Sequence, residues 1–114
     1  MNIVSQGGVD QTTMDEIPRD GGILVVAQWE ANQGKADAVV VKLRRFLPQA
    51  QSEPNVKLFL IGQGNDNPAQ LLFCELFESQ DAFLVHQAGE YKSIVEGQAL
   101  QLLSKRERRQ YSLL

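Results

Sequence analysis

The chain has 114 residues, of which 43% are hydrophobic and 22% are charged, so it is long enough for one domain with a core of its own. A formal net charge of −3 argues against a general nucleic-acid-binding protein. The single cysteine excludes an intramolecular disulfide, and the lack of a leader pattern or of about 18 consecutive apolar residues favours a cytoplasmic protein without a membrane span.

The first part of the chain, residues 1–21, shows no sustained hydrophobic periodicity. It is polar and is interrupted by Gly7-Gly8, Pro18 and Gly21-Gly22, which are typical of irregular structure. We therefore predict an N-terminal arm over residues 1–21 and one folded domain over residues 22–114. The arm is expected to contribute to assembly or to cover a cavity, and not to build the core.

The folded domain is predicted to begin with a strand and a long helix. Residues 23–30 are rich in β-branched side chains and both faces of the strand begin apolar. After the turn at Asn32-Gln33-Gly34, apolar residues recur at helical spacing over residues 36–50. Pro48 lacks a backbone N–H, so this helix should either kink there or stop near Leu47.

The second half of the domain is predicted to contain a hairpin, a helix and a last strand. Apolar runs at 56–61 and 69–78 flank a segment rich in Gly, Asn and Asp, which predicts the hairpin. A helix should start after Ser79, which can cap it, and end near Gly89. One or two helical segments, broken near Gly97, should precede a polar strand over residues 105–114. Its basic residues could contact an acidic partner, although a solvated strand whose charge discourages edge pairing is the simpler interpretation.

The order strand, helix, strand, strand, helix, strand predicts an α+β protein with the split βαβ arrangement of a ferredoxin-like fold. Two helices can cover only one face of its antiparallel sheet. The first three strands are nevertheless apolar on both faces, whereas a sheet with one face in water should alternate cleanly. An identical sheet from a second copy is the economical cover, and we therefore expect a homodimer.

The stretch from Gln70 to Ile94 holds most of the side chains that could carry chemistry. Glu75 interrupts an apolar strand and shares a face with Leu71, Phe73 and Phe77. On the following helix Ala82, Phe83 and His86 fall at i, i+1 and i+4, so the only histidine of the chain should point inward. Imidazole can exchange a proton near neutral pH, which makes His86 the leading catalytic candidate.

This stretch resembles the antibiotic biosynthesis monooxygenase family, ungapped from Glu75 to about Tyr91. The family pattern is a Glu, any residue, an aromatic that is often Trp, a short acidic turn and a His on the next helix. Glu75, Phe77, Glu78-Ser79 and His86 stand at these places, and Glu53-Pro54-Asn55 stands where the family has Glu-Pro-Gly. With the first strand and helix included, the resemblance covers about residues 22–114.

The resemblance implies a dimeric α+β barrel and oxygenation of a small phenol or quinol by O2 without metal or flavin, hence without a cofactor. It implies His86 as the catalytic residue. Phe77 departs from the common Trp and removes an indole N–H that could orient a polar substrate. The Asn, Trp and His set of haem-degrading relatives has no counterpart here, so haem is disfavoured.

Several side chains could bind an aromatic substrate. The aromatic ones are Trp29, Phe73, Phe77 and Tyr91, and the polar ones are Gln28, Tyr91 and Glu75. The alternatives are a core histidine at His86, a structural carboxylate paired with Arg or Lys at Glu75, and plain core for the aromatic set. We expect His86 to border a cavity and to have few packing partners.

No metal-binding, nucleotide-binding or nucleophile motif occurs in the sequence, since one His, one Cys and scattered carboxylates lack the clustering that zinc or iron centres need. Two other functions fit the same fold. One is a non-catalytic dimeric module that binds a small molecule, and the other is an isomerase or cyclase.

Overall fold

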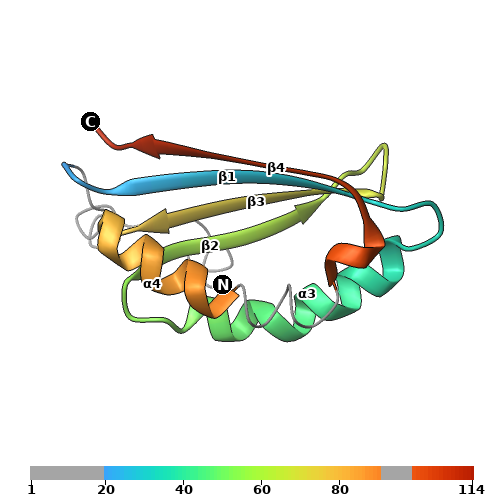
Figure 1. Ribbon diagram of the computed structural model, residues 1–114, viewed down its shortest axis with the longest axis horizontal. Coiled ribbons are helices and arrows are strands. Elements are labelled where there is room, and N and C mark those ends of the chain that lie inside the picture. Colours follow the sequence, from blue (N-terminus) through green and yellow to red (C-terminus); the bar gives the residue numbers. More distant parts are fainter. Residues whose placement is uncertain (1–19, 91–98) are drawn as a thin grey trace.

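The computed structural model describes residues 20–90 and 99–114, which form one sheet and the helices that cover it (Figure 1). The order of elements agrees with the sequence prediction, and the predicted arm lies almost entirely outside the described residues. The elements are β1 (Ile23–Ala31), α3 (Ala36–Gln51), β2 (Val56–Gln63), β3 (Gln70–Phe77), α4 (Gln80–Glu90), the 3-10 helix η2 (Ala99–Leu102) and β4 (Leu103–Ser112).

The four strands form an antiparallel sheet in the order β2-β3-β1-β4, with β1 and β3 at its centre. The register places Val25 of β1 beside Glu75 of β3 on one side and Gln110 of β4 on the other. α3 and α4 lie on the same face of this sheet (Figure 1). This is the predicted ferredoxin-like α+β arrangement.

The long helix α3 continues through Pro48 to Gln51, so the predicted alternative of a stop near Leu47 is wrong, whereas a kink at Pro48 stays a prediction. Pro48 removes one helical hydrogen bond. The last turn is held instead by packing, with Ala50 fully buried, and by the Gln51 side-chain amide, which donates to the Phe59 carbonyl of β2 at 3.0 Å. Contacts with the sheet therefore outweigh the local preference of proline to end the helix.

The face of the sheet beneath the helices, which we call the covered face, carries the core. One group of buried side chains joins α3 to the sheet and includes Trp29, Leu43, Phe46, Phe59 and Phe73. A second group joins α4 to the opposite end of the strands and includes Ile23, Val25, Phe77, Ala82 and Phe83. Strand alternation thus buries the odd-numbered residues of β1 and β3, together with Phe59 of β2.

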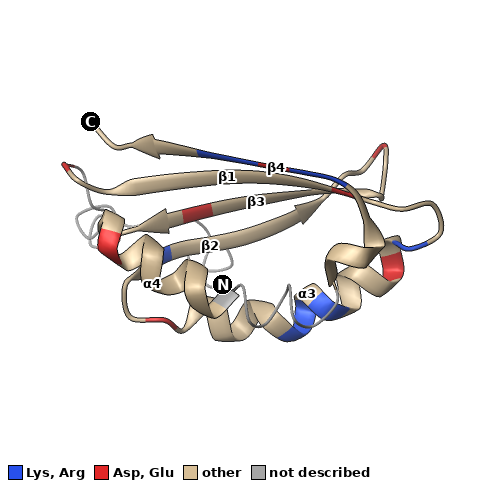
Figure 2. Cartoon of the chain, in the orientation of Figure 1, with Lys and Arg blue, Asp and Glu red and all other residues tan. Residues whose placement is uncertain are grey.

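The other side of the sheet, which we call the open face, is apolar over its centre. Leu72 and Tyr111 are exposed there, at 46% and 49%. Most charges of the sheet lie on β4, at one edge (Figure 2). The register and alternation place these apolar residues on the open face: Leu24, Val26, Leu58, Leu60, Leu72, Cys74, Leu76 and Tyr111.

Candidate active site

The position of His86 follows from the way α4 starts. The Ala82 N–H donates to Ser79 Oγ at 3.1 Å, so Ser79 caps the helix as predicted. This cap fixes the rotation of α4, which buries Phe83 and His86 against the sheet and leaves Val85 71% exposed. The prediction that His86 points inward is confirmed.

The imidazole of His86 packs against three aromatic rings. Its centroid is 5.1 Å from that of Phe77, 5.2 Å from Phe59 and 6.3 Å from Phe46. The side chain is only 1% exposed. The expectation that His86 has few packing partners is therefore wrong, because β2 and α3 each bring a ring to it. A cavity beside it stays a prediction.

Two carboxylates flank the imidazole on opposite nitrogens. His86 Nδ1 lies 2.9 Å from Glu53 Oε2, and His86 Nε2 lies 3.8 Å from Glu75 Oε1. The first distance is that of a charge-assisted hydrogen bond, whereas the second allows electrostatic attraction only. Glu53 is 31% exposed and Glu75 is 4% exposed. Such an arrangement stabilises a protonated ring and suits a group that accepts a proton.

Glu75 occupies the covered face of β3, beside Phe59 of β2 and Val25 of β1. Burial of a carboxylate is costly unless a partner compensates it, and the imidazole of His86 lies within reach. The charge of Glu75 also affects its neighbour in the strand, Cys74, whose side chain points to the opposite face. Burial, and secondly the Glu75 carboxylate, raises the pKa of the adjacent Cys74 thiol. Cys74 itself is half-buried on the open face.

The predicted aromatic set does not gather in one place. Phe77 contacts the imidazole, whereas Trp29 and Phe73 pack on each other, 4.7 Å apart, within the apolar group under α3. Tyr91 lies outside the described residues. The covered face thus has one aromatic group around His86 and another toward the far end of β1 and β3.

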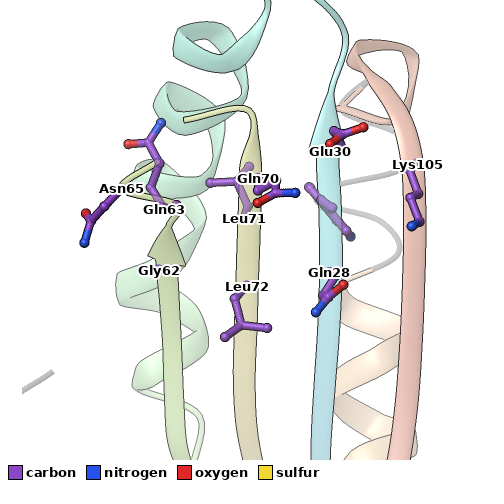
Figure 3. A pocket seen from close by; sticks show the side chains of 11 residues that line it. Gln28, Glu30, Gly62, Gln63, Asn65, Gln70, Leu71, Leu72 and Lys105 are labelled. Atoms are coloured by element: carbon purple, nitrogen blue, oxygen red, sulfur yellow. The ribbon is translucent and has the colours of Figure 1, made fainter. Parts of the chain in front are cut away.

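Gln28 lies on the open face and lines a separate hollow (Figure 3). This hollow has a volume of about 440 Å³ and lies where the β2–β3 turn meets β1. Glu30 and Lys105, which face each other across β1 and β4, also line it, together with Leu72. Because neighbouring residues of a strand point to opposite faces, Gln28 and the His86 group belong to different sites.

Sequence reasoning missed the residues that hold the imidazole. Phe46 and Phe59 read as ordinary core residues of a helix and a strand. The sequence shows Glu53 only as part of a Glu-Pro-Asn turn, and nothing in its spacing links it to a histidine 33 residues later. The sequence offers one signal for this contact: Glu53 stands directly before Pro54, which restricts its backbone, and the chain has only one histidine that such a carboxylate could bind.

Two findings concern other kinds of site. Among residues 20–90 and 99–114, no three His, Cys, Asp or Glu side chains are grouped so that they could hold a metal ion. None of the helices within these ranges is long and apolar enough to cross a membrane.

The fold and the buried histidine can now be compared with known proteins. The arrangement defines an α+β protein of ferredoxin-like fold. The chain belongs to the antibiotic biosynthesis monooxygenase family, whose model matches residues 22–95. A comparison with curated proteins gave no match.

Solved structures share this fold at low identity. A protein from Shewanella oneidensis superposes with a TM-score of 0.74 at 22% identity, over 82% of this chain and 91% of its own. One from Pseudomonas aeruginosa gives 0.75 at 19%, over 83% and 96%. A candidate antibiotic biosynthesis monooxygenase from Nitrosomonas europaea gives 0.75 at 16%, over 84% and 93%. At these identities the likeness shows the fold alone.

Proposed function

We propose that the protein is a monooxygenase that acts with O2 on a small phenol- or quinol-like aromatic, with His86 as the proton acceptor. The observation that carries the proposal is the position of His86, buried between two carboxylates and under three aromatic rings. Membership of the antibiotic biosynthesis monooxygenase family supports the same function.

The proposed reaction starts with the transfer of a proton from a substrate hydroxyl to His86. The O–H bond breaks, an N–H bond forms, and the substrate keeps the electron pair as an oxyanion. This electron-rich anion reduces O2: the O–O bond breaks, and one oxygen atom forms a bond with a ring carbon whose C–H bond breaks. The other oxygen atom leaves as water with that hydrogen and the hydroxyl proton, and the ring is oxidised to the quinone level. The substrate supplies the electrons, and the proposal therefore needs neither metal nor flavin. Exclusion of water around the ring favours these steps.

Phe77 and Glu75 are the predicted substrate contacts that lie beside the imidazole. We propose that Phe77 packs on the substrate ring and that Glu75 accepts a hydrogen bond from a second hydroxyl. Trp29 and Phe73 would act farther from the reacting atoms, as the apolar wall under α3.

A homodimer is the second part of the proposal. The open face presents apolar side chains from all four strands, including the exposed Leu72 and Tyr111. A sheet with one face in water would carry polar residues at these positions. Packing two open faces together would give a two-sheet barrel with the helices outside and would leave each His86 group within its own protomer.

The competing function is a non-catalytic module that binds a small aromatic molecule. The near-complete burial of the His86 side chain favours it, because a ring that is 1% exposed must be reached through a movement of its surroundings. The same contacts would then stabilise the fold and orient a bound ligand without chemistry.

Oxygen uptake distinguishes the two. Purified, metal-free protein is incubated with a panel of dihydroxyaromatics, aerobically and anaerobically, using wild type, His86→Gln and His86→Ala. The control is Val85→Ala, on the exposed side of the same helix. Uptake by wild type and the control, but not by folded His86 variants, supports the oxygenase. Saturable binding without uptake supports the module. Thermal melting verifies that each variant is folded.

A further inference from the structure

The hydrogen bond between His86 and Glu53 links two parts of the chain that are distant in sequence. Glu53 follows the end of α3, and its Oε2 lies 2.9 Å from Nδ1 of the imidazole on α4. It is the shorter of the two carboxylate contacts of the ring. The turn between α3 and β2 therefore determines how the imidazole is oriented over the sheet.

The chemistry of the contact determines which ring nitrogen carries hydrogen. A carboxylate can only accept a hydrogen bond, so Nδ1 must be the donor. In the neutral ring the hydrogen then resides on Nδ1, and Nε2 is the nitrogen with a lone pair. That nitrogen faces β3, where Glu75 Oε1 is 3.8 Å away.

The described elements bring three aromatic rings and a second carboxylate to the imidazole. α3 contributes Phe46 and β2 contributes Phe59, while β3 contributes Phe77 and the Glu75 carboxylate. Farther out, the Arg108 guanidinium of β4 lies 5.4 Å from the centre of the Phe83 ring on α4. Among the described contacts of the ring, Glu53 is the negative group within hydrogen-bond distance.

We propose that Glu53 is a positioning residue for His86, which keeps the hydrogen on Nδ1 and leaves Nε2 to take the proton of the substrate. This rests on the proposed function. The substrate O–H bond breaks, an N–H bond forms at Nε2, and Glu53 stabilises the resulting imidazolium without itself accepting the proton. The proton returns to the reduced oxygen atom when water forms. Glu53 lies on the Nδ1 side of the ring, away from the reacting atoms.

Nuclear magnetic resonance can test the contact directly, because His86 is the only histidine in the chain. Protein labelled with nitrogen-15 histidine gives one pair of ring nitrogen signals, whose two-bond couplings to the ring protons identify the protonated nitrogen. We expect hydrogen on Nδ1 in the neutral ring of wild type. In Glu53→Gln we expect a mixture of tautomers and loss of the ring charge at lower pH than in wild type. Glu78→Gln, which removes a surface carboxylate 57% exposed, should leave both unchanged.

Kinetics then test the role in turnover. We expect Glu53→Gln to lower kcat by about 10- to 100-fold with KM little changed, as when the group that orients a reacting imidazole is removed. Glu53→Asp should recover part of the loss. The inference is overturned by hydrogen on Nε2 in neutral wild type, by a Glu53→Gln ring that titrates like wild type, or by unchanged kcat in that variant. A wild type that consumes no oxygen overturns the proposed function and this role in turnover, while the resonance data still decide the contact.

Discussion

The two faces of the sheet are formed by the same strands but differ in burial and in chemistry. The covered face buries a histidine and a glutamate among aromatic rings, and every buried side-chain polar atom among the described residues has a hydrogen-bond partner. The open face has an apolar centre, a polar hollow at one end and basic residues along β4, with Leu72 almost half exposed. The described side chains of the covered face are thus packed within one chain, whereas the open face leaves Leu72 and Tyr111 exposed, and we propose that a second copy covers it. We expect substitutions on the first to affect folding and chemistry, and those on the second to affect assembly.

The largest effect is expected at the centre of the covered face. Phe59 is 1% exposed and contacts both Phe46 and the imidazole of His86. Phe59→Ala should lower the free energy of unfolding by about 3–5 kcal/mol, because it removes a buried ring and leaves a cavity. Denaturant titration measures the loss. Val41→Ala, on the exposed side of α3, serves as the control and should change stability by about 0.5 kcal/mol or less. Similar losses in the two variants would contradict the assigned core.

The next effect concerns assembly through the open face. Light scattering at micromolar concentration should give about twice the chain mass for wild type and about the chain mass for Leu72→Glu, because a buried charge opposes packing of the two faces. Val85→Glu places the same charge on the outer side of α4 and should remain dimeric. A monomeric wild type, or dimers in all three proteins, would show that this face does not form the interface.

Cys74 lies on the open face, so its reactivity tests the proposed interface. Burial, and secondly the Glu75 carboxylate, raises the pKa of its thiol above the ordinary value of 9.0. Because the thiolate is the reactive form, iodoacetamide should alkylate native protein at least about tenfold more slowly than unfolded protein near pH 8. Leu72→Glu should narrow this difference by uncovering the thiol. Equal rates in native and unfolded wild type would contradict both the burial and the interface.

The raised pKa of the Cys74 thiol also makes the free energy of unfolding depend on pH. The folded state favours the neutral thiol, so this contribution to stability is present below pH 9.0 and is lost as the pH rises through the folded pKa. Cys74→Ala should remove this alkaline dependence, which denaturant titration at several pH values measures. If Cys74→Ala lost stability at alkaline pH as wild type does, the loss would come from other titrating groups.

The smallest effect is expected at the surface. Lys57 and Glu78 form an ion pair of 3.7 Å, and their side chains are 32% and 57% exposed. Glu78→Gln should lower the free energy of unfolding by about 0.2–1 kcal/mol, and less at high salt, because water screens the pair. A loss comparable to that of Phe59→Ala would mean that the pair is more strongly desolvated than its exposure indicates.

The sequence predicted the order of elements and the faces to which the residues of β1 and of β3 around Glu75 point. Alternation in β1 and β3 and the four-residue spacing of Ala82 and His86 on α4 are local patterns, and they placed Glu75 and His86 on the same face correctly. The choice between a helix that stops near Leu47 and one that continues through Pro48 could not be made from the sequence, since it depends on packing and on the contact of Gln51 with β2.

The details of the site depend on contacts between distant segments. The bond from Glu53 to His86 arises only when the α3–β2 turn and α4 meet over the sheet, and no local pattern encodes that meeting. The separation of the aromatic residues into two groups also depends on distant segments. Phe73 and Phe77 lie on one face of β3 but at different places along it, and they therefore meet different helices. Sequence patterns thus assign faces, whereas positions along a face require the assembled sheet.

The central claim is that chemistry at the His86 group transfers one oxygen atom from O2 to an aromatic substrate. The most direct measurement is a turnover experiment under isotopically labelled dioxygen, with the product analysed by mass spectrometry. We expect one labelled oxygen atom per product molecule with wild type and with Leu72→Glu if that variant stays folded, and none above background with folded His86→Gln. A product without label, or equal labelling with wild type and His86→Gln, would contradict the claim.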